Sequence, residues 1–174
     1  MSKTILLLGS NIENREVYLH RALEYLSLKI GHIIQCSDIY ESEPWGFDTN
    51  TDFLNQAVII ETMLNPFELL KELLNIEYLL GRRRVKDHQN YVPRIIDIDI
   101  IFYDNFIINT KNLIIPHPFF TQRKFAIIPV YSIAPFFIHP LLNKNVKTIL
   151  TECNDNSKVT LHKKYVNNIK SCII

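Results

Sequence analysis

Apolar residues recur along the chain in two patterns, and polar, turn-forming segments separate them. Runs rich in β-branched and aromatic residues predict strands at Lys3–Leu8, His32–Tyr40, Phe53–Thr62 and Pro93–Tyr103. Stripes of helical spacing predict helices at Arg15–Leu28 and from Asn65 to about Leu80. The resulting order, βαββαβ, is typical of a ferredoxin-like α+β fold, an antiparallel sheet with helices packed on one face.

Shorter elements follow the fourth strand. We expect a short strand at 106–108, a helical piece at 119–124, a helix at 146–151 and an edge strand at 159–161. A length of 174 residues is enough for one domain with a sizeable core. We therefore predict a single domain over 1–174, with its core at about 3–150 and a C-terminal extension at 151–174.

Two acids interrupt the apolar character of the fourth predicted strand. Asp97 and Asp99 lie two residues apart, so in a strand they share one face, while Ile96, Ile98, Ile100 and Phe102 take the other. Paired carboxylates repel each other and are costly to desolvate. They are also suitable ligands for Mg²⁺ that carries a nucleotide's phosphates. Two acids on a solvent-exposed face would give the same pattern.

Two long loops carry unusual residues. The first, 41–52, contains Trp45, the only tryptophan, which could be a buried anchor or a ligand contact. The second, 82–93, is strongly basic and leads through Arg94 into the acidic strand. Arginine pairs with carboxylates, but it also binds phosphate oxygens through two parallel hydrogen bonds. His117, fixed between two prolines, and Arg123 resemble a second set of phosphate contacts.

Composition excludes several functional classes. Charged residues make up 21% of the chain and the net charge is +1, which gives no indication of a nucleic-acid partner. No apolar run is long enough to span a membrane, and no signal-peptide pattern is present. The three cysteines are widely spaced without a metal-ligand pattern. We expect a cytoplasmic protein and a monomer.

Six short segments occur in a characteristic order between residues 4 and 140. They are Leu8-Gly9-Ser10-Asn11, Glu43-Pro44-Trp45-Gly46, Asp52-Phe53-Leu54-Asn55, Glu77 with Gly81-Arg82, Pro93-Arg94-Ile95-Ile96-Asp97-Ile98-Asp99-Ile100, and Ile115-Pro116-His117-Pro118 with Arg123 and Phe125. Together they resemble the 6-hydroxymethyl-7,8-dihydropterin pyrophosphokinase family. The segment Asn90-Tyr91-Val92 departs from the pattern, because the family usually has Trp-Gly before Pro-Arg.

The resemblance implies a ferredoxin-like fold and Mg²⁺-dependent transfer of pyrophosphate from ATP to the pterin's hydroxymethyl oxygen, with release of AMP, in folate biosynthesis. It assigns two Mg²⁺ to Asp97 and Asp99, and catalysis to these acids with Arg82 and Arg94. For ATP it implies Glu77, Arg84, Tyr91, Arg94, Ile100, His117, Pro118 and Arg123. For the pterin it implies Ser42, Glu43, Trp45, Phe53, Asn55, Asp97 and Phe125, with the two phenylalanines sandwiching the ring.

Two other classes of protein fit part of this pattern. A metal-dependent nucleotidyltransferase could use the same acids, but the chain lacks a Gly-rich nucleotide motif at the start of a helix. A non-enzymatic ferredoxin-like module for RNA or a small molecule would use sheet aromatics and a basic loop. Such a module gives no reason for paired acids beside an anion site.

Overall fold

The structure, a computed structural model, describes residues 1–12, 14–46, 51–82 and 94–166. Its main elements along the chain are β1 (Ser2–Ser10), α1 (Arg15–Lys29), β2 (Gly31–Cys36), β3 (Ile39–Ser42), β4 (Phe53–Thr62), α2 (Pro66–Leu79) and β5 (Asp97–Tyr103). Then come β6 (Ile108–Asn109), β7 (Ile114–Ile115), a 3₁₀ turn (Phe120–Gln122), α3 (Lys124–Ile133), β8 (Ile138–His139), β9 (Lys144–Asn145), α4 (Val146–Glu152) and β10 (Val159–Lys163). No helix within the described ranges has both the length and the apolar character needed to cross a membrane.

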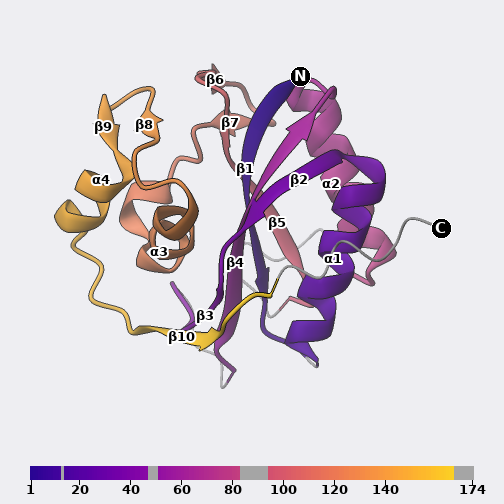
Figure 1. Ribbon diagram of the computed structural model, residues 1–174, viewed down its shortest axis with the longest axis horizontal. Coiled ribbons are helices and arrows are strands. Elements are labelled where there is room, and N and C mark those ends of the chain that lie inside the picture. The colour runs from indigo at the N-terminus through magenta and orange to yellow at the C-terminus, as the bar shows by residue number, and fades with distance from the viewer. Residues whose placement is uncertain (13, 47–50, 83–93, 167–174) are drawn as a thin grey trace.

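One antiparallel sheet organises the molecule. Its strands lie in the order β10-β3-β4-β1-β5, and β2 also pairs with β4 (Figure 1). The central strand β1 pairs with β4 along its whole length and with β5 on its other side. This arrangement confirms the ferredoxin-like α+β fold expected from the order of the elements.

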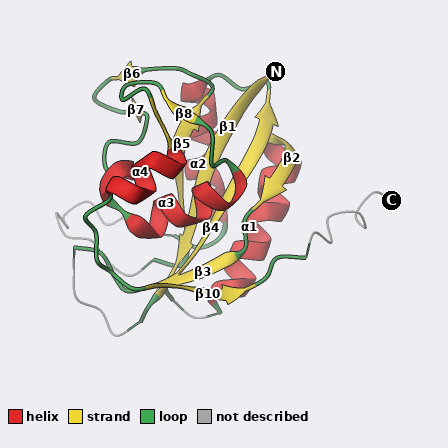
Figure 2. Ribbon diagram, turned by 60° about the vertical axis from the view of Figure 1, so that its left-hand side comes forward, coloured by secondary structure: helices red, strands yellow, loops and turns green. Residues whose placement is uncertain are grey.

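Helices cover both faces of the sheet (Figures 1 and 2). Because side chains alternate along β1, Leu6 and Leu8 enter a core with α1 and α2. Ile5 and Leu7 enter a second core with α3 and α4. The expectation of helices on one face was therefore wrong. The helix α4 begins at a cap, because Oδ1 of Asn145 accepts the N–H of Thr148 at 2.8 Å, whereas α3 has no side-chain cap and contains a proline.

The second and the fourth predicted strands differ from the structure, each at a point where regular strand pairing is interrupted. The strand expected at 32–40 is broken at Ser37, whose backbone N–H and hydroxyl bond to the backbone of Ala57 instead. In β5, the register with β1 shifts by one residue between Ile100 and Phe102. Phe102 consequently packs in the α3 and α4 core, and not with Ile98 and Ile100 as a regular alternation predicts. Ile108–Asn109 pairs with β7 rather than with β5.

The start of α2 is set by local chemistry. The side chain of Asn65 accepts hydrogen bonds from the N–H groups of Phe67 and Glu68, at 3.0 and 3.1 Å. The carboxylate of Glu68 accepts from the N–H of Asn65 at 2.9 Å, which completes a capping box. This cap, with Pro66 in the first turn, confirms the helix start that the sequence predicts.

We expect Asn65→Ala to lower the free energy of unfolding by about 1 kcal/mol, because two N–H groups of the first turn lose their acceptor. Urea denaturation followed by circular dichroism measures this change. Asn75→Ala is the matched control in the exposed middle of the same helix, where the side-chain amide makes a 3.4 Å contact with Glu72. If both variants have the stability of the parent protein, the cap does not contribute.

Candidate active site

One pocket opens on the sheet face that also carries α3. It comprises about 530 Å³ of space, part of which is open to solvent. The lining residues are Leu7, Gly9, Ser42, Glu43, Trp45, Phe53, Asn55, Arg94, Asp97, Asp99, Arg123 and Phe125. All seven residues that the resemblance assigns to the pterin are in this set. Three others that it assigns to phosphates or metal, Arg94, Asp99 and Arg123, are also there.

Aromatic and amide groups form one part of the pocket. Phe53 begins β4 and Phe125 lies in the first turn of α3, so the two rings reach the pocket from different layers of the fold. Asn55 is buried, and its amide donates to the hydroxyl of Ser42 at 2.9 Å across the β3–β4 pair. This hydrogen bond fixes the orientation of a polar side chain inside an apolar pocket, which suits a flat polar heterocycle.

Gly9 is a member of the pocket that the sequence did not identify. The predicted strand ended at Leu8, but Gly9 and Ser10 also belong to β1. Gly9 pairs with Asn55 on one side and with Asp97 on the other. A Cβ atom at this position would lie 3.6 Å from Oδ1 of Asn55 and 3.9 Å from the Phe53 ring, so the glycine leaves space over the pocket floor.

The pKa values of Asp97 and Asp99 are shifted in opposite directions. Burial alone would raise the pKa of Asp97, but the guanidinium groups of Arg94 and Arg82, each bonded to one of its carboxylate oxygens, hold that pKa below its usual value. Burial, and then the neighbouring Asp97 carboxylate, raise the pKa of Asp99 to about 7. The pocket thus holds an excess of carboxylate that a cation would stabilise.

The donor set fits a cation that brings its own additional ligands. Two carboxylates on one strand face are hard oxygen donors of the kind that Mg²⁺ prefers. Among the residues that the structure describes, no group of three or more His, Cys, Asp or Glu side chains could hold a metal ion alone. A cation at Asp97 and Asp99 would therefore complete its coordination with water and with oxygens of a bound ligand, such as phosphate.

Glu77 holds the acidic strand against α2. This residue is 2% exposed, and its Oε1 accepts the N–H of Ile98 at 2.9 Å. The same oxygen lies 2.7 Å from Nη1 of Arg82, which in turn binds Asp97. A continuous chain of charged contacts thus links the last turn of α2 to the first residue of β5. The resemblance assigns Glu77 to ATP, and its contacts here are with the protein.

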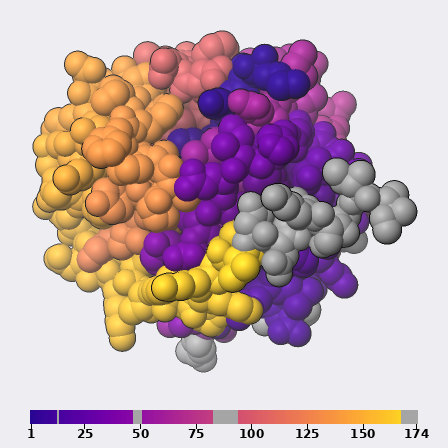
Figure 3. Space-filling view, in the orientation of Figure 1, coloured from indigo at the N-terminus to yellow at the C-terminus, as the bar shows by residue number. Residues whose placement is uncertain are grey.

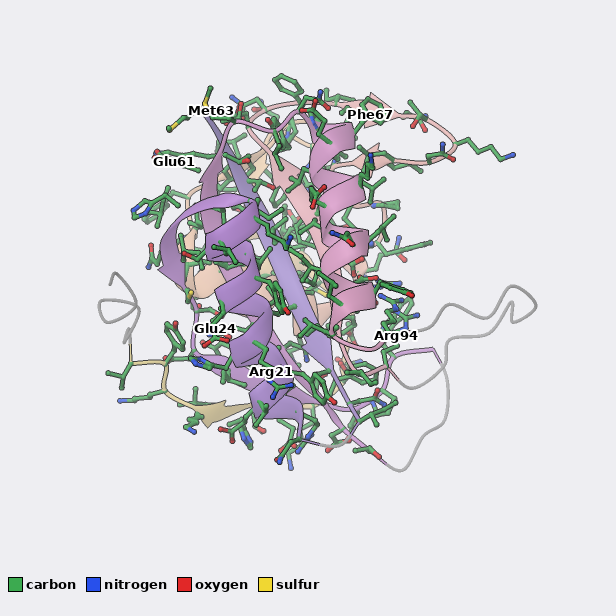
Figure 4. All side chains as sticks on the ribbon, turned by 90° about the vertical axis from the view of Figure 1, so that its right-hand side faces the viewer. Arg21, Glu24, Glu61, Met63, Phe67 and Arg94 are labelled. Atoms are coloured by element: carbon green, nitrogen blue, oxygen red, sulfur yellow. The ribbon has the colours of Figure 1, made fainter. Side chains whose placement is uncertain are left out.

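The end of β1 positions Arg94. The N–H of Arg94 donates to Oδ1 of Asn11 at 2.6 Å, and the N–H of Asn11 donates to the carbonyl of Arg94 at 3.1 Å. The hydroxyl of Ser10 donates to the carbonyl of Ile95 at 2.5 Å. Figure 4 shows Arg94 near the C-terminal end of α2. The residue before α1, Asn14, makes no side-chain cap, and the side chain of Asn11 bonds to the residue that leads into β5.

Arg123 lines the pocket, and His117, which is not among the lining residues, lies in the segment between β7 and the 3₁₀ turn. Arg123 is 7% exposed, and its guanidinium carbon lies 4.5 Å from the centre of the Trp45 ring and 4.9 Å from that of Phe119. Burial and then the positive charge of Arg123 lower the pKa of His117 to about 4, so its imidazole is neutral near pH 7. Its Nδ1 accepts from the N–H of Phe119 at 3.2 Å.

Four residues assigned to ATP are placed differently or lie outside the described ranges. The side chain of Ile100 is in the α1 and α2 core, and its backbone pairs with Leu6 of β1. Pro118 is exposed beside His117. Arg84 and Tyr91 fall within 83–93, outside the residues that the structure describes.

Comparison with known proteins gives consistent matches. Residues 5–135 match the family model described as 7,8-dihydro-6-hydroxymethylpterin-pyrophosphokinase (HPPK). The chain is 39% identical over 152 residues to the 2-amino-4-hydroxy-6-hydroxymethyldihydropteridine pyrophosphokinase of Aquifex aeolicus, which covers 87% of this chain and 92% of that protein. It is 42% identical over 127 residues to the protein of the same name from Bacillus subtilis, over 72% of this chain and 74% of that one.

Some similar proteins are longer. A structure of HPPK-DHPS from Plasmodium falciparum has a TM-score of 0.69 and 20% sequence identity over 87% of this chain. The chain spans 43% of the length of that structure. It spans 20% of the folic acid synthesis protein fol1 of Pneumocystis carinii, with 38% identity over 149 residues. The structural likeness supports the fold assignment.

We expect Glu77→Ala to lower the free energy of unfolding by about 3 kcal/mol, because Arg82 loses a buried carboxylate and the N–H of Ile98 loses its acceptor. Glu77→Gln keeps an acceptor oxygen of the same shape and removes only the charge, so it should cost less than the alanine variant. Urea denaturation measures both. Equal stability of all three proteins would show that the chain of contacts through Glu77 does not hold β5.

Proposed function

The chain belongs to the 7,8-dihydro-6-hydroxymethylpterin-pyrophosphokinase family, and from this membership we propose its reaction. It transfers pyrophosphate from ATP to the 6-hydroxymethyl oxygen of 7,8-dihydropterin in folate biosynthesis. The hydroxymethyl oxygen attacks the β-phosphorus, the bond from that phosphorus to the α–β bridging oxygen breaks, and AMP leaves with that oxygen. The observation that carries this proposal is a single pocket that holds both the aromatic and amide set and the acid pair.

The pterin binds through the aromatic and amide set. Phe53 and Phe125 contact the two faces of the ring, and Asn55 with Ser42 bonds its polar edge. Glu43 and Trp45 close the same side of the pocket. This placement directs the hydroxymethyl group toward Asp97 and Asp99, because all of these residues line one continuous surface.

ATP binds through the charged set. Asp97 and Asp99 would hold two Mg²⁺, and these ions would neutralise negative charge on the triphosphate. Arg82, Arg94 and Arg123 contact phosphate oxygens, as does His117, whose neutral imidazole can donate one hydrogen bond. Arg84, Tyr91 and Pro118 complete the proposed nucleotide contacts. Glu77, which is buried, acts through Arg82, and the side chain of Ile100 lies in the core.

The contacts of Asp97 suggest how the charged set changes when substrate binds. Both of its oxygens accept guanidinium hydrogen bonds in the described structure. A cation at Asp97 would compete with these guanidinium groups for the negative charge of the carboxylate, and phosphate oxygens would then be available as partners of the two arginines. Catalysis is mainly the positioning of reactants and the neutralisation of charge.

We further propose that residues 1–174 act as one domain, because β10, which lies beyond residue 150, belongs to the sheet that carries the pocket. A monomer suffices for the reaction, since one chain supplies both residue sets. Substrates of this polarity and the absence of a membrane-crossing helix in the described ranges agree with a cytoplasmic location.

We expect ³¹P NMR of the protein with ATP, Mg²⁺ and 6-hydroxymethyl-7,8-dihydropterin to show AMP and a new diphosphate ester, formed only when the pterin is present. Omission of Mg²⁺ should stop the reaction. Formation of ADP would indicate transfer of a single phosphoryl group, and free pyrophosphate would favour a nucleotidyltransferase. Intact ATP would contradict the proposed function.

We expect Asp97→Ala to lower kcat by at least about 10³-fold, because the variant loses a metal ligand and the partner of two arginines. Its circular dichroism spectrum should remain that of a folded protein. Glu152→Ala, which breaks an exposed 2.7 Å ion pair with Lys144, serves as the control and should keep full activity. An active Asp97→Ala enzyme would refute the metal assignment.

A further inference from the structure

Arg15 connects two segments that are far apart in sequence. It is the first residue of α1 and lies outside every motif of the family resemblance. Its Nη1 donates to Oε1 of Glu41 at 2.8 Å and to the carbonyl oxygen of Asp52 at 2.7 Å. The side chains of Arg15 and Glu41 are 22% and 30% exposed, so this ion pair is partly shielded from solvent.

The two segments held by Arg15 lead directly into the proposed pterin site. Glu41 precedes Ser42 in β3, and Asp52 precedes Phe53 in β4. Ser42 and Phe53 are directly paired across the two strands, and both line the pocket. A side chain that fixes Glu41 and Asp52 therefore fixes the spacing of these strand ends, and with it the positions of the Ser42 hydroxyl and the Phe53 ring.

The C-terminal strand supports the same strand ends from the outside. In β10, Val159 pairs with Ser42 and Thr160 pairs with Glu41. Near its end, Nζ of Lys163 lies 2.6 Å from Glu16, and Nε2 of His162 lies 2.9 Å from Glu16. The first turn of α1, β3 and β10 are thus joined by charged contacts. Figure 2 shows β3 and β10 side by side, and Figure 3 shows the yellow C-terminal segment packed against the purple part of the chain.

We propose that Arg15 is a positioning residue for the pterin substrate, acting through the ends of β3 and β4. This inference rests on the proposed function, since it takes the pterin as the ligand of this side of the pocket. Arg15 is absent from the pocket lining, so it contributes by holding groups that bind. Loss of its two hydrogen bonds frees Ser42 and Phe53 from one constraint, while Asp97, Asp99 and Arg94 keep their own contacts on β5 and β1. The effect should therefore fall on the pterin and spare the nucleotide.

The test compares Arg15→Ala with Arg15→Lys. We expect Arg15→Ala to raise the KM for 6-hydroxymethyl-7,8-dihydropterin about tenfold, with kcat and the KM for ATP changed less than about twofold. Since one nitrogen makes both contacts, a lysine ammonium can replace it in part, so Arg15→Lys should show a smaller rise. Lys144→Ala, which removes a 2.7 Å ion pair to Glu152 far from the pocket, is the matched control and should match the parent enzyme.

Direct binding gives a readout that does not need turnover. Trp45 is the only tryptophan and lines the pocket, so its fluorescence reports pterin binding. The Kd for the pterin should rise about tenfold in Arg15→Ala, in step with KM. The midpoint of thermal unfolding of each variant shows whether a substitution destabilises the whole protein or acts locally. If Arg15→Ala folds poorly, Arg15→Lys provides the comparison.

Three outcomes decide the matter. An unchanged pterin Kd and KM in Arg15→Ala would overturn the inference. An equal rise in KM for both substrates, with a lower midpoint of unfolding, would also overturn it by showing a general structural role. Failure of the parent enzyme to form AMP would refute the proposed reaction, and the Trp45 titration would still show whether Arg15 controls pterin binding.

Discussion

The structure depends on the compensation of two carboxylates buried side by side on β5. Asp97 stays ionised because Arg82 and Arg94 bind it, since an unpaired buried charge is very costly, whereas the arginines near Asp99 offset its burial only in part. Each cation comes from a different part of the chain. Arg82 follows α2, Arg94 precedes β5, and Arg123 precedes α3. The elements that carry these arginines must therefore converge on one end of the sheet, and the packing of both layers brings them there.

The same arrangement explains why one sheet face can serve as both core and binding surface. Leu7 illustrates the transition, because it belongs to the α3 and α4 core and also lines the pocket. Toward one end of β1 the apolar contacts continue to α3 and α4. Toward the other, Gly9 has no side chain, and the space is bounded by aromatic rings and charged groups. The apolar rings of Phe53 and Phe125 extend the core, and they also line the pocket, where a flat ligand can bind.

The sequence predicted those structural features that depend on residues close together in the chain. The bounds of β4 and the cap of α2 follow from strand propensity and from the chemistry of Asn65 and Glu68, which act within a few residues. The candidate site was predicted from motifs, and the structure brings the seven pterin residues together. What could not be predicted depends on partners distant in sequence. Three features form only when the sheet is assembled. They are the bulge that turns Phe102 toward the α3 and α4 core, the hydrogen bond from Arg94 to Asn11, and the hydrogen bond from Arg15 to Glu41. No periodic pattern encodes such contacts.

The strand order has a consequence for the behaviour of the protein in solution. Sheet edges expose unpaired N–H and C=O groups, and these can recruit strands of other chains. Here β10 covers β3 and becomes the outer strand itself. It is five residues long, most of its residues are exposed, and it includes a lysine, features that discourage edge-to-edge pairing. Because β10 lies beyond residues 5–135, the part that matches the family model, the protection of this edge of the sheet comes from a segment outside that match.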